Sequence, residues 1–173
     1  EALKDADVLF KVNPPTSEEI SYMKKGALAV SYMNPFQSGE LIKNMASSGI
    51  DAFSVELIPR ISRAQSMDAL SSQASIAGYK AVILAANNAN KFFPMLTTAA
   101  GTVRPAQTLI VGAGVAGLQA IATAKRLGSR VIAFDVRSST KEQIESLGAQ
   151  FLDTGITAEG EGGYARELSA EEL

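Results

Sequence analysis

The stretch "QTLIVGAGVAGLQAIATAKRLG", residues 107–128, constrains the fold more than any other part of the chain. An apolar run leads into three glycines, and a helical pattern follows them. Gly112 permits a tight turn, Gly114 lets a ligand approach the backbone, and Gly117 lets the helix pack against the strand. The stretch therefore predicts a strand, a turn and a helix whose N-terminus binds the phosphates of a nucleotide.

An acidic residue predicts which nucleotide binds there. The next predicted strand, over residues 130–135, ends at Asp135, 18 residues after Gly117, near the spacing of about 20 at which a carboxylate meets an adenosine ribose. A 2′-phosphate would be repelled at this place, so we expect NAD(H) rather than NADP(H). Arg137 could accommodate such a phosphate, but we favour a solvated surface arginine. The predicted coenzyme-binding residues are Gly112, Gly114, Val115, Ala116, Gly117, Asp135, Val136 and Arg137.

The chain contains two sets of three apolar runs, separated by helical segments, and this alternation predicts parallel sheets. The fold class expected is α/β, with two Rossmann-like parallel-sheet blocks. The second block has only three strands and is a partial dinucleotide-binding fold, so we expect the chain to be a fragment of a longer protein. The predicted strands cover 7–12, 27–32 and 51–57 in the first block, and 107–111, 130–135 and 150–153 in the second.

Three predicted regions follow from this pattern. They are a partial N-terminal α/β domain over 1–58, a loop and connecting helix over 59–99, and the first half of an NAD-binding Rossmann domain over 100–173. The first helix, over 17–25, has Thr16 or Ser17 as its cap. In the connecting helix, expected over 72–93, Gly78 predicts close packing against another backbone. A turn is expected at "GTVRPA" and a last short helix over 164–173.

The loop "PRISRAQSMDALSSQ", residues 59–73, is too polar and too specific in its residue types for a plain linker. Arg60 and Gln65 can bond a carboxamide, while Asp68 and Ser71 can bond a ribose or an amide. On the residues alone, a surface loop whose Asp68 or Ser71 caps the following helix is an equally good interpretation.

Composition removes several function classes. The net charge of −2, without a long basic run, gives no electrostatic support for nucleic-acid binding. The chain has no cysteine and no histidine, so it lacks thiolate catalysis, Cys-based zinc sites and the commonest general base. The uncharged run 105–124 is long enough to span a bilayer, but its proline, glutamines and glycines favour a strand, a turn and a helix.

Five segments together resemble the NAD(H)-binding component of proton-translocating nicotinamide nucleotide transhydrogenase, a family related to alanine dehydrogenase. They are "PRISRAQSMDALSS", "AGYKAVILAA", "TTAAGTV", "IVGAGVAGLQAIATAKRLG" and "FDVR". The resemblance implies that Arg60 and Ser71 contact the nicotinamide carboxamide. It assigns Gln65 and Asp68 to the nicotinamide ribose and the partner contact. It also implies that Tyr164, in the glycine-rich "GEGGYAREL", closes over the nucleotide.

The resemblance further implies the reaction and the partners. Hydride passes directly between NADH on this chain and NADP+ on an NADP(H)-binding component, coupled to proton translocation by a membrane domain. A homodimer is expected, as a soluble domain peripheral to the membrane, on the cytoplasmic face in a bacterium or the matrix side in a mitochondrion. The chain alone is expected to be inactive.

Two other functions stay open. Alanine dehydrogenases resemble the chain at Lys11, where their lysine holds the carboxylate of pyruvate, but the region of their catalytic histidine reads "SYMNPF" here. We expect Lys11 to snorkel from a strand end instead. A non-catalytic NAD(H)-binding module is the other possibility, although such a module does not need a loop that orients the nicotinamide.

Overall fold

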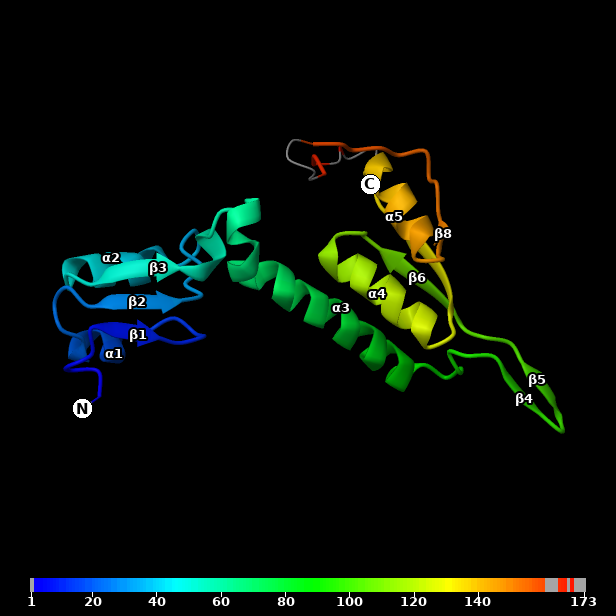
Figure 1. Cartoon of the computed structure of the whole chain (residues 1–173), viewed down its shortest axis with the longest axis horizontal. Coiled ribbons are helices and arrows are strands. Elements are labelled where there is room, and N and C mark those ends of the chain that lie inside the picture. Colours follow the sequence, from blue (N-terminus) through cyan, green and yellow to red (C-terminus); the bar gives the residue numbers. More distant parts are fainter. Residues whose placement is uncertain (1, 161–164, 168, 170–173) are drawn as a thin grey trace. The chain divides into compact units, whose positions relative to one another are not determined.

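The computed structural model describes residues 2–160, 165–167 and 169, and it divides into two compact units. The first unit is Glu1–Leu70 and the second is Ser71–Leu173 (Figure 1). The boundary falls within the first turn of a long helix, α3 (Ala69–Asn88). The predicted division at residues 58 and 99 stays a prediction.

The first unit contains a parallel sheet, as predicted. Its strands β1 (Val8–Phe10), β2 (Leu28–Ser31) and β3 (Asp51–Ser54) follow one another in the order β1-β2-β3. All three are shorter than the apolar runs that predicted them. The run 51–57 ends in a 3-10 turn, η1 (Val55–Leu57).

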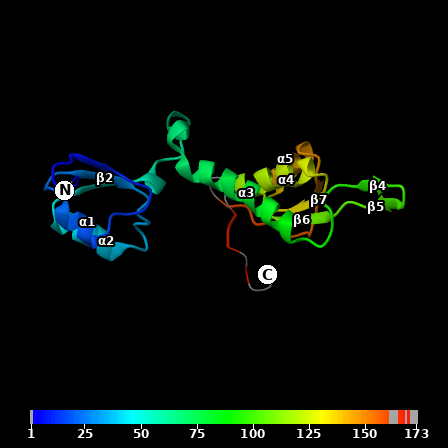
Figure 2. The same cartoon turned by 90° about the horizontal axis from the view of Figure 1, so that it is seen from below.

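Two helices, α1 (Ser17–Tyr22) and α2 (Gly39–Ser47), lie on one face of this sheet (Figure 2). Thr16 caps α1, which confirms one of the two predicted caps. Its hydroxyl accepts a hydrogen bond from the Glu19 amide at 3.2 Å, and the Glu19 carboxylate accepts one from the Thr16 amide at 2.7 Å. This capping box satisfies two amides that the first helical turn leaves unpaired. The core between helices and sheet consists of Ile20, Met23, Ala27, Ala29, Met33, Met45 and Ile50.

The second unit contains the second predicted parallel sheet, in the order β6-β7-β8. Within the described residues, no helix is both long enough and apolar enough to cross a membrane. The run 105–124 instead forms a strand, a turn and most of a helix, as predicted. The elements are β6 (Gln107–Val111), α4 (Val115–Arg126), β7 (Arg130–Phe134), η3 (Ser138–Thr140), α5 (Lys141–Ser146) and β8 (Gln150–Phe151).

A β-hairpin occupies a segment for which only a turn was predicted. Strands β4 (Leu96–Thr98) and β5 (Gly101–Val103) pair antiparallel and project from the second unit (Figures 1 and 2). The predicted turn at "GTVRPA" is therefore wrong over its first three residues. The reason is that each strand is only three residues long, too short for an alternating pattern to be recognised. The preceding helix, α3, begins three residues earlier than predicted.

Gly78 packs against a backbone, as predicted. A Cβ atom at Gly78 would lie 2.0 Å from the carbonyl oxygen of Ala116. Ala116 lies in the first turn of α4, directly after the glycine turn. This contact holds α3 against the helix end that carries the candidate site.

We expect Gly78→Ala to lower the free energy of unfolding of the second unit by about 1–3 kcal/mol, the usual cost of overpacking. Urea denaturation followed by circular dichroism measures the loss. Gly39→Ala in α2 is the matched control, because a Cβ atom there meets nothing within 4 Å. That control should be neutral or stabilising by up to about 1 kcal/mol. Equal losses in both variants would contradict the close contact.

Candidate functional site

The glycine turn joins β6 to α4 in a conformation that requires glycine at two positions. Gly112 has φ of +92°, in the left-handed region, and its amide donates to the carbonyl of Phe134 at 2.7 Å. A Cβ atom at Gly117 would lie 1.8 Å from the carbonyl oxygen of Gly112. The first turn of α4 therefore lies directly on the glycine turn.

The second glycine of the motif faces open space. Gly114 is the N-cap of α4, has no side-chain cap bond, and a Cβ atom there would meet nothing within 4 Å. The first amides of a helix, here those of Val115, Ala116 and Gly117, have no intrahelical acceptor. Backbone donors and the positive end of a helix dipole thus border an accessible space, which fits a phosphate group.

Asp135 directly follows β7 and is nearly buried, with a side chain 7% exposed. Its Oδ2 accepts hydrogen bonds from the Ala113 amide at 2.6 Å and from Nη2 of Arg137 at 2.8 Å. Its Oδ1 accepts from the amide and Nε of Arg137, both at 2.9 Å. Burial acts to raise the pKa of Asp135, but the bonds from Arg137 and Ala113 outweigh it and lower the pKa to about 2. Asp135 is therefore ionised at neutral pH and tied to the glycine turn.

Arg137 is not the solvated surface arginine that we expected. Its side chain is only 20% exposed, and its guanidinium forms a bidentate ion pair with Asp135. The chain turns at Arg137 into η3, where the Thr140 hydroxyl donates to the Arg137 carbonyl at 2.8 Å. This turn directs the long side chain back over the carboxylate two residues earlier.

A small pocket of about 100 Å³ adjoins Asp135, and sequence reasoning missed it. The segment after β8 helps to form it, since the Ala158 amide donates to the carbonyl of Val136 at 2.7 Å. No sequence pattern indicated that this segment returns to the end of β7. Tyr164 lies outside the described residues, as does most of the helix expected over 164–173. The pocket is lined by Phe134, Asp135, Ser138, Lys141, Phe151, Asp153, Thr154, Ile156 and Thr157.

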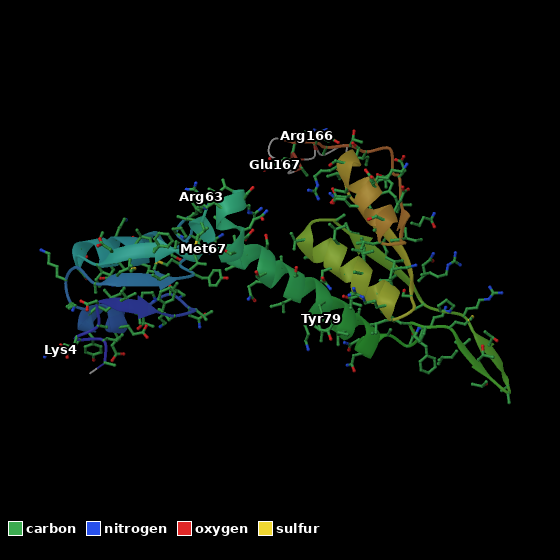
Figure 3. The ribbon with its side chains drawn as sticks, in the orientation of Figure 1. Lys4, Arg63, Met67, Tyr79, Arg166 and Glu167 are labelled. Atoms are coloured by element: carbon green, nitrogen blue, oxygen red, sulfur yellow. The ribbon has the colours of Figure 1, made fainter. Side chains whose placement is uncertain are left out.

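In the first unit, the polar loop contains a 3-10 segment, η2 (Ser62–Met67), which Figure 3 shows with Arg63 and Met67 labelled. Arg60, Gln65 and Asp68 line one pocket of about 180 Å³, together with Pro59, Ile61, Ser62 and Ala64. The buried side chain of Ala64, 4% exposed, anchors the segment. The structure thus brings together three of the four residues predicted for the nicotinamide site. Ser71 does not line this pocket and lies in the first turn of α3.

Lys11, which follows β1, does not snorkel into solvent as we expected. Its ammonium donates to both carboxylate oxygens of Glu19, each at 2.7 Å. This bond, together with one from the Thr16 amide, lowers the pKa of Glu19. Since the expectation considered only the strand, it missed the helix that brings a carboxylate to the strand end. A ligand carboxylate would have to displace Glu19 to reach Lys11.

A second carboxylate at this edge of the first sheet was also missed. Glu56 accepts hydrogen bonds from the amides of Met33 and Asn34 and from the Ser54 hydroxyl. Burial acts to raise the pKa of Glu56, but these donors outweigh it and lower the pKa. Asn34 has φ of +46°, a conformation that few non-glycine residues adopt. Glu56 therefore holds the segment "SYMNPF" in place.

Two family models match the chain. The model of the alanine dehydrogenase/PNT N-terminal domain covers residues 1–77, and that of the alanine dehydrogenase/PNT C-terminal domain covers residues 81–172.

The chain is also similar to individual proteins. An NAD(P) transhydrogenase alpha subunit of Rickettsia prowazekii (strain Madrid E) is 49% identical over 177 residues, which are 99% of this chain and 46% of that protein. The crystal structure of transhydrogenase from Sinorhizobium meliloti matches with a TM-score of 0.85 and 55% identity, over 87% of this chain and 45% of that one. Alanine dehydrogenase of Bacillus subtilis (strain 168) is 25% identical over 158 residues, 88% of this chain and 40% of that protein. The chain thus spans less than half the length of these proteins, and it belongs to the alanine dehydrogenase/PNT family.

Proposed function

We propose that the chain is the NAD(H)-binding part of a transhydrogenase. The observation that carries this proposal is the 49% identity to a transhydrogenase alpha subunit across 99% of the chain. The open glycine turn at the N-terminus of α4 supports it, because this geometry fits a pyrophosphate. When bound, NADH supplies a hydride, which passes from C4 of its nicotinamide to C4 of NADP+ on a partner component.

Each predicted residue has one role in this proposal. The glycine turn and the amides of Val115 and Ala116 hold the pyrophosphate, and Asp135 holds the adenosine ribose with Val136 and Arg137 beside it. Arg60 and Ser71 bind the nicotinamide carboxamide, while Gln65 and Asp68 bind the nicotinamide ribose and contact the partner. Tyr164 closes over the bound nucleotide.

The reaction does not require an acid or a base from the protein. No proton is abstracted from a substrate when hydride moves between two nicotinamides. A chain without histidine or cysteine is therefore compatible with it. The residues act by orienting the ring and excluding water, so that the two carbon atoms reach a near-attack distance.

The coenzyme preference tests the adenosine half of the proposal. We expect NADH to bind about 5- to 1000-fold more tightly than NADPH, which corresponds to about 1–4 kcal/mol of repulsion between Asp135 and a 2′-phosphate. Calorimetric titration of the chain with each coenzyme measures the ratio. Asp135→Asn should weaken NADH binding and narrow the preference. Equal affinities for the two coenzymes in the unchanged chain would refute it.

The proposed partners are an NADP(H)-binding component, a membrane domain that conducts protons, and a second copy of the chain. The relative from Rickettsia prowazekii is named as one subunit of its enzyme, which supports partner subunits here. The proposed location is peripheral to a membrane, on the cytoplasmic face in a bacterium or the matrix side in a mitochondrion. The exposed side chains of Met95 and Val103 flank the projecting hairpin, and we assign the dimer contact to them.

An amino-acid dehydrogenase fits the site less well. Lys11 is already bound to Glu19, the chain has no histidine, and the alanine dehydrogenase relative is only 25% identical. A non-catalytic module is distinguished by assay. It would bind NADH but would show no reduction of an NADP+ analogue when an NADP(H)-binding component is added.

A further inference from the structure

The bonds of Asp135 give Arg137 a role beyond the proposed function, on whose coenzyme site this inference rests. We propose that the Arg137 guanidinium occupies the place of the adenosine ribose hydroxyls in the empty protein. The nucleotide must then displace it from Asp135 in order to bind.

The carboxylate of Asp135 has no acceptor position left for a ligand. An ionised carboxylate offers about four lone-pair positions. In the structure, each of its oxygens already accepts two hydrogen bonds: one from a backbone amide, of Ala113 or Arg137, and one from the Arg137 guanidinium. A ribose can bond this carboxylate only if a donor leaves.

The guanidinium is the donor that can leave. The Ala113 amide belongs to the glycine turn, which the hydrogen bond from the Gly112 amide to Phe134 fixes to β7. The Arg137 amide is fixed by η3, where both the amide and the hydroxyl of Thr140 donate to the Arg137 carbonyl. The guanidinium, in contrast, is at the end of a flexible side chain and can rotate away without any backbone change.

The guanidinium also matches the group that replaces it. It offers Nε and Nη2 to the two oxygens of Asp135 as a fork of two parallel donors. The 2′- and 3′-hydroxyls of a ribose are likewise two adjacent donors. A 2′-phosphate removes one of them and adds negative charge, so NADP(H) cannot make this exchange. Arg137 therefore sharpens the preference that Asp135 creates.

The exchange predicts opposite effects on the empty and the bound protein. Arg137→Ala should lower the Tm of the empty chain, because a nearly buried carboxylate loses its cation. It should also tighten NADH binding by about 10- to 100-fold, if the pair is open in about 1–10% of empty molecules. The rise in Tm that NADH produces should consequently be larger than in the parent chain. Arg137→Lys, with the charge but without the fork, should lie between the two and serves if the alanine variant does not fold.

The test uses calorimetric titration and thermal unfolding of the parent chain, both Arg137 variants and Arg130→Ala. Arg130 is the matched control, an exposed arginine at the start of β7 whose side chain makes no ion pair with the described residues. A second pair of probes, ADP and 2′-deoxy-ADP, isolates the hydroxyl. The gain in affinity should be large for ADP and small for 2′-deoxy-ADP.

The outcomes separate this inference from the proposed function. If the parent chain binds NADH and both Arg137 variants bind it equally or more weakly, Arg137 is a bystander or a ligand, and the inference is wrong. The same holds if ADP and 2′-deoxy-ADP gain equally. If the parent chain does not bind NADH, the proposed coenzyme site itself fails and the inference with it.

Discussion

Gly114→Val should weaken NADH binding by at least about 100-fold, or about 2.7 kcal/mol, while the second unit stays folded. The valine side chain would fill the open space in front of α4, where we place the pyrophosphate. A Cβ atom at Gly114 meets no other group of the protein. Its φ of −75° and ψ of −168° suit any residue. The cost to the fold should be only that of a poor helix N-cap, about 1 kcal/mol.

The neighbouring glycine supplies the contrast. Gly117→Val should unfold or strongly destabilise the second unit, because its Cβ would lie 1.8 Å from the Gly112 carbonyl oxygen. Fluorescence titration with NADH reports binding, and urea denaturation reports the fold. If Gly114→Val binds NADH as the parent chain does, the glycine turn is not the phosphate site. Equal destabilisation by both substitutions would show that the space before α4 is closed.

The sequence predicts the glycine turn well because everything that defines it is local. The strand expected over 107–111 is β6, and the helix expected to end near Leu127 ends at Arg126. Gly78 illustrates the limit of such reasoning. A glycine inside a helix predicts a close backbone contact, but only the folded chain reveals that its partner is Ala116.

Charged side chains were harder to predict than glycines, because their partners depend on the fold. Asp135 was identified by its place at a strand end, yet its bond to the Ala113 amide depends on the spacing of two strands. The ion pair of Lys11 with Glu19 joins a strand to a capping box. Glu56 holds two amides of a distant loop. In each case a residue judged by its own neighbourhood received its function from another element.

Substitution of Gln65 or Asp68 should reduce hydride transfer by about 10- to 1000-fold, the range expected when reacting atoms lose their alignment. Both residues line the pocket that η2 helps to form in the first unit, and we assign them to the nicotinamide end. The proposed contacts to pyrophosphate and adenosine are made elsewhere, by the glycine turn and Asp135. The dissociation constant of NADH should therefore change much less than the turnover.

The assay measures reduction of an NADP+ analogue by NADH, with and without an NADP(H)-binding component, for Gln65→Asn and Asp68→Asn. Ser66→Ala is the matched control, since Ser66 belongs to the same 3-10 segment but does not line the pocket. A transhydrogenase whose own domain has the same substitutions allows turnover to be compared even if this chain alone is inactive. Unchanged turnover in both variants would leave the loop as a linker that caps α3. Turnover without any partner would indicate a self-contained dehydrogenase, because the second nicotinamide would then not be needed.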